Sequence, residues 1–131
     1  MFGSVNWLAA VVAALATFLV GGPWYRVFGK RWNREMAFGE SHRGGHPARV
    51  FGLAYVFSLF STACLSALLG PHAGAVWGLL FGAVVGLCFV AASFGVNYQF
   101  ANRSLVALLI DGGYHTLQFA AFGLVLGAWP G

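Results

Sequence analysis

Four polar side chains near the C-terminal end are the best candidates for chemistry. Tyr114, His115 and Gln118 follow Asp111 by three, four and seven residues, so a helix places all four on one face. They lie in a largely apolar stretch, residues 104–128, in which Asp111 is the only acidic residue. A carboxylate at the centre of a membrane-spanning helix costs at least about 2.5 kcal/mol. If this stretch crosses a membrane, Asp111 must face other helices and find hydrogen-bond donors or a proton.

Two interpretations of this polar stripe are open. In the first it is a proton or cation site, in which Asp111 titrates, His115 is its partner and Gln118 coordinates through its amide. In the second it is a hydrogen-bond network between helices that stabilises their packing. Asn97, at the end of the preceding apolar stretch, lies at a similar depth. The stripe offers one carboxylate and one imidazole, whereas a conducting path needs several ionisable groups, so the structural interpretation is favoured.

Other kinds of chemistry find little support in the sequence. It contains no Ser-His-Asp order, phosphate-binding loop or paired carboxylates. A haem held by two histidines would need two chains, because His115 is the only histidine inside an apolar stretch. Glu40, His42 and His46 form only a loose group in a glycine-rich segment. We expect no metal, no cofactor and no enzymatic activity.

The composition indicates a membrane protein. Apolar residues make up 60% of the chain and charged residues 8%, whereas a soluble domain carries about a quarter charged residues. A helix needs roughly 20 apolar residues to span a bilayer, and only helices or closed barrels satisfy the backbone there. The sequence therefore predicts an all-α, four-helix membrane bundle as a single domain over 1–131. It contacts lipid and no nucleic acid, and its spans are about 4–22, 50–69, 74–98 and 104–128.

The basic residues predict an orientation. All seven fall in the first or third loop between these spans: Arg26, Lys30, Arg31, Arg34, Arg43, Arg49 and Arg103. With four spans these two loops lie on the same side of the membrane. Lys and Arg accumulate in cytoplasmic loops, so we expect both termini to lie outside the cytoplasm.

A short amphipathic helix is expected between the first two spans, over about 24–38. Gly21-Gly22-Pro23 is a strong helix-breaking signal, and we expect the first span to end there. Aromatic residues then recur at four-residue spacing, with basic residues on another face. This pattern is typical of a helix in the headgroup layer or docked on the bundle. The expected interfacial anchors are Trp24, Phe28, Trp32, Arg26, Lys30 and Arg34.

Small residues recur along three of the spans. They let membrane helices approach closely, which is how such helices associate in lipid. We therefore predict tight packing, with at least one ridge facing another chain. The ridges are Gly74, Gly78, Gly82 and Gly86; Ser58, Thr62, Ser66 and Gly70; and Gly112, Thr116, Ala120, Gly123 and Gly127.

Several motifs resemble those of one known family. They are Gly22-Pro23-Trp24-Tyr25, Phe28-Gly29-Lys30-Arg31-Trp32, Asn97-Tyr98, Ile110-Asp111-Gly112-Gly113-Tyr114-His115 and Leu126-Gly127-Ala128-Trp129. Together they resemble the bacterial four-span membrane proteins grouped as domain of unknown function 1761 (DUF1761), over nearly the whole chain. The resemblance implies four membrane helices in a bacterial inner membrane and brings no activity.

These observations favour a protein that acts by association, as a homo-oligomer or as an accessory subunit of a larger membrane complex. The length of the small-residue ridges and the scarcity of chemical groups motivate this hypothesis. The alternative is a small proton- or cation-linked transporter or channel that uses the stripe from Asp111 to His115.

Overall fold

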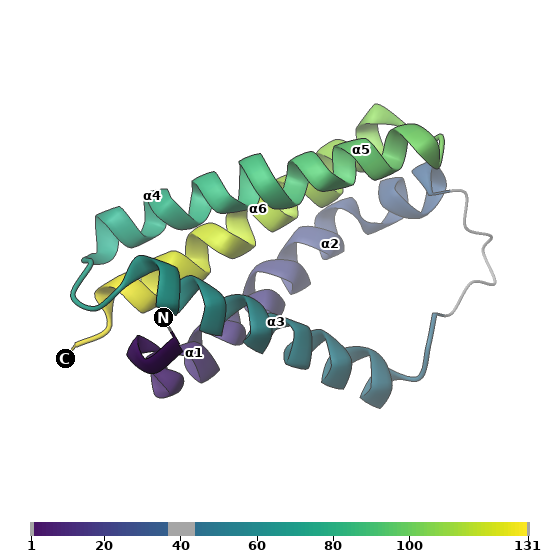
Figure 1. The fold of residues 1–131 in the computed structure, drawn as a ribbon. Coiled ribbons are helices and arrows are strands. Elements are labelled where there is room, and N and C mark those ends of the chain that lie inside the picture. The colour runs from purple at the N-terminus through teal and green to yellow at the C-terminus, as the bar shows by residue number, and fades with distance from the viewer. Residues whose placement is uncertain (1, 37–43, 131) are drawn as a thin grey trace.

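The four expected spans are present. The structure is a computed structural model that describes residues 2–36 and 44–130. Its long apolar helical segments are Trp7–Glu35, Pro47–Leu69, Ala75–Phe100 and Leu105–Ala128 (Figure 1). Each is long and apolar enough to cross a bilayer. The chain is therefore all-α, with the architecture of a four-span membrane bundle.

Local signals set where several helices begin. The side chain of Asn6 accepts a hydrogen bond from the backbone N–H of Ala9, and that of Ser104 accepts one from Ala107. Nδ1 of His46 accepts from the backbone N–H of Ala48. The elements are η1 (Phe2–Ser4), α1 (Trp7–Ala14), α2 (Ala16–Glu35), α3 (Pro47–Leu69), α4 (Ala75–Val85), a π-helical turn η2 (Gly86–Ala91), α5 (Ala92–Phe100) and α6 (Leu105–Ala128).

Within the described residues no separate amphipathic helix follows the first span, so that prediction is wrong. Helix α2 continues through Pro23 to Glu35. Proline is tolerated inside membrane helices because neighbouring helices re-satisfy the backbone and hold the segment in place. Here Trp24 and Trp32 both donate hydrogen bonds to groups on α6. The last residues of the expected helix, 37 and 38, lie outside the described residues.

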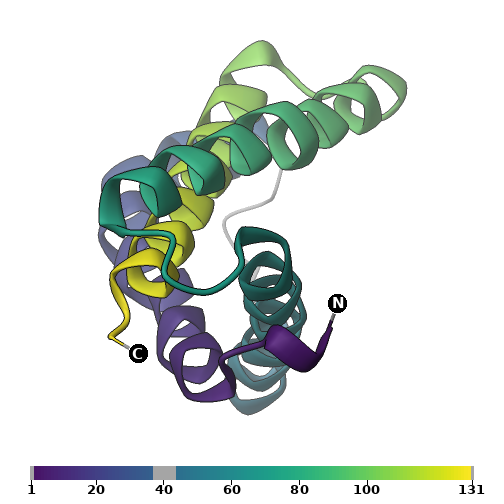
Figure 2. The same ribbon diagram turned by 60° about the vertical axis from the view of Figure 1, so that its left-hand side comes forward.

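The glycine ridge of the third span packs against α6 of the same chain. A Cβ atom added at Gly78 would lie 2.1 Å from the carbonyl oxygen of Gly123, and one at Gly82 would lie 2.0 Å from that of Phe119. Just before α4 begins, the N–H of Gly74 donates a 3.0 Å hydrogen bond to the carbonyl of Gly127. Figure 1 and Figure 2 both show α4 and α6 side by side. This ridge and the α6 ridge opposite it therefore pack against each other within the chain.

The π-helical turn keeps small residues facing α6 beyond Gly86. In this turn the N–H of Ala92 donates to the carbonyl of Leu87, five residues back. The ridge therefore advances by five residues, from Gly86 to Ala91, and then by four to Gly95. A Cβ at Gly112 would lie 3.3 Å from the Cβ of Ala91.

Helix α3 is joined to the bundle through polar side chains at one end. Thr62 donates a 2.9 Å hydrogen bond to the carbonyl of Ala10, and Oγ of Ser66 accepts a 3.1 Å bond from the N–H of Asn6. Ser58, Thr62 and Ser66 are buried, so most of the second ridge is also used within the chain. Toward Pro47, α3 diverges from α2 (Figure 1).

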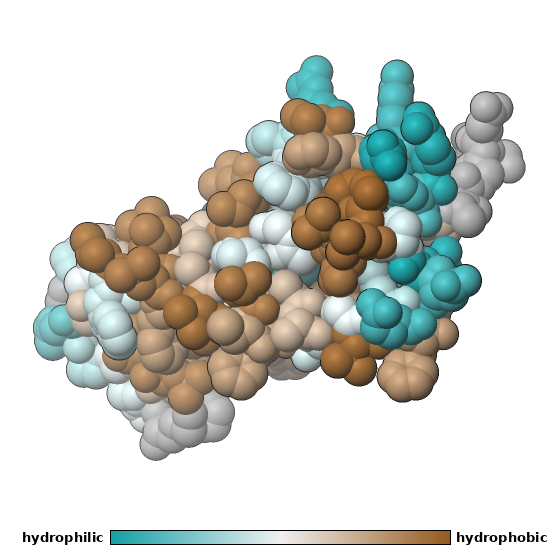
Figure 3. Space-filling model, turned by 90° about the horizontal axis from the view of Figure 1, so that it is seen from above, coloured by the Kyte–Doolittle hydropathy of each residue, from teal (hydrophilic) through white to brown (hydrophobic). Residues whose placement is uncertain are grey.

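The two basic segments lie at one end of the bundle, as expected. Arg103 donates a 2.6 Å hydrogen bond to the carbonyl of Met36, and Ser104 donates a 3.2 Å bond to Glu35. Glu35 also pairs with Arg31 at 3.1 Å. Figure 3 shows hydrophilic residues gathered at this end, beside a largely apolar surface. The ends of α2 and α6 are thus tied together next to the charged surface.

Candidate functional site

Asp111 is enclosed by three aromatic hydrogen-bond donors, which we call the Asp111 cluster. Oη of Tyr25 donates to Oδ1 at 2.5 Å, and Nε1 of Trp32 donates to Oδ2 at 3.1 Å. The hydroxyl of Tyr98 donates a short hydrogen bond to the same Oδ2. The Asp111 residue is 5% exposed. These three donors satisfy the carboxyl group inside the bundle, where an unpaired one would be costly.

The cluster joins three helices. Tyr25 and Trp32 are seven residues apart on α2, so two turns of helix bring both to one face. Tyr98 comes from α5 and Asp111 from α6. One residue earlier on each helix, Nε1 of Trp24 donates a 2.9 Å hydrogen bond to the carbonyl of Ile110. The polar contacts of Asp111 therefore hold α2 and α5 against α6.

A second polar group, the His115 chain of hydrogen bonds, begins one turn further along α6. Nδ1 of His115 is 2.6 Å from Oε1 of Gln118. Nε2 of Gln118 donates to Oγ1 of Thr17 at 2.8 Å, and Oγ1 of Thr17 is 2.6 Å from Oγ of Ser58. The imidazole stacks on the ring of Phe94, with 4.8 Å between the centroids. This series of hydrogen bonds connects α6 to α2 and then to α3.

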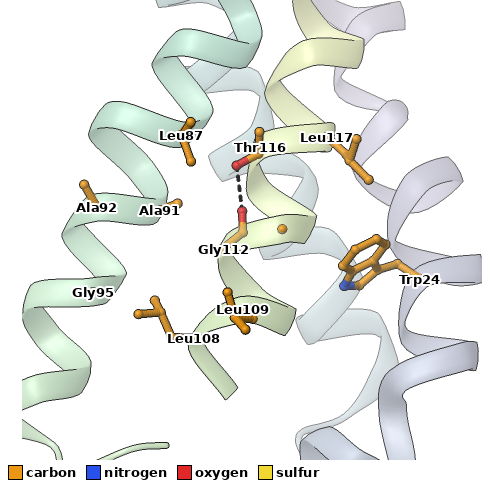
Figure 4. A pocket seen from close by; sticks show the side chains of 11 residues that line it. Trp24, Leu87, Ala91, Ala92, Gly95, Leu108, Leu109, Gly112, Thr116 and Leu117 are labelled. Carbon is orange, nitrogen blue, oxygen red and sulfur yellow. Dashed lines mark hydrogen bonds between the residues drawn. The ribbon is translucent and has the colours of Figure 1, made fainter. Parts of the chain in front are cut away.

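An apolar groove opens beside the Asp111 cluster, and we call it the small-residue groove. Its volume is about 620 Å³. Figure 4 shows Ala91, Ala92 and Gly95 on one side, the ring of Trp24 on the other side, and α6 between them. The hydroxyl of Thr116 donates to the carbonyl of Gly112 within α6, at 2.8 Å (Figure 4). The hydroxyl of Thr116, which lines the groove, therefore already has a hydrogen-bond partner within α6.

Two adjoining clefts lie between α3 and the rest of the bundle, and we call them together the α3 cleft. They have volumes of about 410 and 630 Å³ and share Thr17, Ala54 and Tyr114. His115 and Gln118 line the smaller one. The larger one continues to Val50 near the start of α3.

A family model described as "Protein of unknown function (DUF1761)" matches residues 8–127. The chain belongs to the DUF1761 family. No curated protein and no solved structure matches it.

The polar stripe of this DUF1761 protein is divided between separate contacts. Asp111 belongs to the Asp111 cluster, whereas His115 and Gln118 belong to the His115 chain. Tyr114 donates a 2.8 Å hydrogen bond to the carbonyl of Thr17. Asn97 is exposed and joins neither group, while its neighbour Tyr98 is buried against Asp111.

Sequence reasoning missed four of the residues that build these groups. The sequence pattern predicts Trp32 as an interfacial anchor and gives no role to Tyr25, and it does not link Thr17 or Ser58 to the stripe. The seven-residue spacing of Tyr25 and Trp32 is a usable signal once α2 is taken to continue through Pro23.

The expected interfacial anchors separate into two groups. Trp24 and Trp32 donate hydrogen bonds to α6, and Phe28 packs on Trp24 with 4.7 Å between ring centroids. The basic side chains are exposed on the other side of α2: Arg26, Lys30 and Arg34.

The described residues of this DUF1761 protein contain no group of three or more His, Cys, Asp or Glu that would suit a metal. His46 of the loose histidine segment caps α3. Glu40 and His42 lie outside the described residues.

Proposed function

We propose that this DUF1761 protein acts by association within the membrane and is not an enzyme. In this proposal the small-residue groove receives a transmembrane helix of another chain. That chain is a second copy of the protein or another subunit of a membrane complex. In either case the partner helix binds in the same groove and packs against it in the same way.

Gly95 is the observation that carries the proposal. Gly78 and Gly82 have to be glycine because a Cβ there would collide with backbone of α6. A Cβ at Gly95 would meet only the side chain of Leu108, at 3.7 Å, which is ordinary van der Waals contact. Packing within the chain therefore does not require glycine at 95, and the missing side chain leaves room in the groove for close approach of a helix from outside.

The chemistry of the groove suits a helix surface. In lipid, helices associate through close packing, and small residues permit it. Ala91, Ala92 and Gly95 form one wall. Because Thr116 is bonded within α6, a partner helix needs no matching polar group. The occupant that fits is an apolar helix with small or branched side chains.

The same proposal places the protein in a bacterial inner membrane with the basic end at the cytoplasmic surface. Arg103 and the basic residues of α2 lie at one end of the bundle, and such residues accumulate on the cytoplasmic side. Both termini then lie outside the cytoplasm.

The test is a comparison of two glycine variants. Gly95→Leu fills the groove, whereas Gly52→Leu changes a helical glycine of α3 whose added Cβ meets nothing within 4 Å. Each is extracted from membranes in a lipid-retaining polymer and sized by native electrophoresis. We expect the unmodified protein and Gly52→Leu to migrate as the same complex and Gly95→Leu to migrate as a single chain. Migration of the unmodified protein as a single chain contradicts the proposal.

The transport alternative has less support. It needs an accessible Asp111 linked to His115, but Asp111 is covered by Tyr25, Trp32 and Tyr98, and His115 bonds elsewhere. Proton or cation flux into liposomes that is lost in Asp111→Asn would favour transport over association.

A further inference from the structure

The His115 chain has a single consistent direction of hydrogen bonding, and it is set at its far end. Oγ of Ser58 lies 2.8 Å from the carbonyl oxygen of Ala54, so Ser58 must donate its one hydrogen there. The 2.6 Å contact between Ser58 and Thr17 must then be donated by Thr17. This step leaves Oγ1 of Thr17 as an acceptor only.

The direction of hydrogen-bond donation can be followed from Thr17 to His115. With its own hydrogen used, Thr17 must accept from the amide nitrogen of Gln118, which fixes the orientation of that amide. Oε1 of Gln118 then faces His115, so Nδ1 of His115 must be the protonated nitrogen. In a neutral imidazole the other nitrogen, Nε2, is then an acceptor.

Nε2 of His115 is open to a ligand. It has no hydrogen-bond partner among the described residues. No fully enclosed side-chain nitrogen or oxygen of those residues lacks a partner, so Nε2 must have accessible surface. His115 lines the smaller part of the α3 cleft. Because this cleft borders the imidazole, we infer that Nε2 offers it a hydrogen-bond acceptor near the middle of α6 and of the membrane.

The rest of the cleft suits an apolar tail. From the polar group at Thr17 it continues between α2 and α3, where Phe18, Gly22, Val50 and Phe51 line it. Phe51 and Phe57 at its edges are more than half exposed, so the cleft opens sideways toward lipid. A molecule can enter it from the bilayer without crossing water.

We propose that the α3 cleft binds a lipid-soluble alcohol or phenol, whose hydroxyl donates to Nε2 of His115 while its apolar tail lies along α2 and α3. A hydroxyl inside hydrocarbon lacks a partner and costs free energy, so an acceptor at this depth selects molecules that carry one. A molecule with only acceptor oxygens, such as an ether or an oxidised quinone, is not selected. The site is lined by other residues of α6 than the small-residue groove, and it does not depend on association.

Binding of matched probes to the protein in lipid nanodiscs tests this proposal. The probes are radiolabelled farnesol, a short-tailed alkyl hydroquinone, and the methyl ether of each. We expect saturable binding of at least one hydroxyl probe, at least tenfold tighter than its ether. Whichever hydroxyl probe binds more tightly shows whether the head group of the ligand is an isoprenoid alcohol or a quinol. Equal binding of hydroxyl and ether probes, or no saturable binding of either hydroxyl, overturns the proposal.

Variants assign the binding to His115. His115→Phe keeps an aromatic ring against Phe94 but removes the acceptor, so the hydroxyl probe should bind no better than its ether. Ser93→Ala removes a hydroxyl of α5 that is bonded to the carbonyl of Phe89, away from the cleft, and should leave binding unchanged. A tenfold preference that persists in His115→Phe overturns the proposal.

A spectroscopic measurement covers the case in which His115→Phe does not fold. Histidine ¹⁵N spectra of the unmodified protein should show a neutral imidazole protonated at Nδ1, whose Nε2 signal moves with the hydroxyl probe and not with the ether. An imidazole protonated at Nε2, or no probe-dependent shift, overturns the proposal.

Discussion

The hydroxyl of Tyr25 donates a 2.5 Å hydrogen bond to the carboxyl group of Asp111, across 86 positions of sequence. This contact holds the part of α2 that follows Pro23 against α6. Together with Trp32 and Tyr98 it makes Asp111 a junction between helices. The cost of placing a carboxyl group in the membrane is thereby offset inside the bundle.

If Asp111 is a junction, removing it costs stability. Asp111→Leu leaves three donors without an acceptor, and we expect a loss of about 2–3 kcal/mol in the free energy of unfolding. Tyr25→Phe removes one donor and should cost about 1 kcal/mol. In the Asp111→Leu background Tyr25→Phe should cost almost nothing, because its acceptor is already gone. Unfolding in mixed detergent micelles measures all three, and additive losses would rule out the direct contact.

The close packing of α4 on α6 predicts which glycines tolerate a methyl group. Gly78→Ala places a Cβ 2.1 Å from a backbone oxygen, so the helices must separate, at a cost of about 1–3 kcal/mol. Gly52→Ala is the matched control in α3, where the added atom meets nothing within 4 Å and the change should stay within about 0.5 kcal/mol. The same unfolding assay compares them. Equal effects would mean that α4 and α6 are not in contact at Gly78.

The continuous α2 predicts a distance across Pro23. Leu19 and Asn33 are both exposed on this helix. Fourteen residues at a rise of 1.5 Å place their backbones about 21 Å apart. A helix that turned at Pro23 to lie along the membrane surface would bring them to about 16 Å. Spin labels at Leu19→Cys and Asn33→Cys, with Cys64 and Cys88 replaced by Ala, measure this distance by pulsed electron resonance.

The gathering of basic residues at one end predicts the orientation of the chain. A periplasmic alkaline phosphatase fused after residue 131 should be active, and a green fluorescent protein at the same place should be dark. Replacing Arg26, Lys30 and Arg34 with Gln weakens the charge bias and should give a mixed population. A bright fluorescent fusion on the unmodified chain would reverse the proposed orientation.

Much of the fold follows from composition and spacing. Four spans, the common end of the basic loops and the close packing of the glycine ridge were all predictable, because each depends on local properties of the chain. Gly78 and Gly82 recur at four-residue spacing, and that spacing is enough to give one helix a small face. Which helix covers this face is a tertiary property, and α6 of the same chain covers it.

The site was less predictable, because its partners come from distant helices. Trp32 follows Pro23 and lies among basic residues, so local rules place it at a membrane surface; packing against Asp111 determines its actual position. Asp111 and His115 share a face of α6 by spacing. Asp111 nevertheless bonds to side chains of α2 and α5, whereas the hydrogen bonds of His115 lead through α2 to α3. Spacing along one helix therefore identified the polar residues but not their grouping.

Site-specific photo-crosslinking in living cells is the most direct test of association through the small-residue groove. A benzophenone amino acid is placed at Leu109, on the edge of the groove, and at Phe60, an exposed residue of α3, as the control. We predict a discrete protein adduct from Leu109 that Gly95→Leu abolishes, with only lipid adducts from Phe60. Only lipid adducts from both positions would contradict the account.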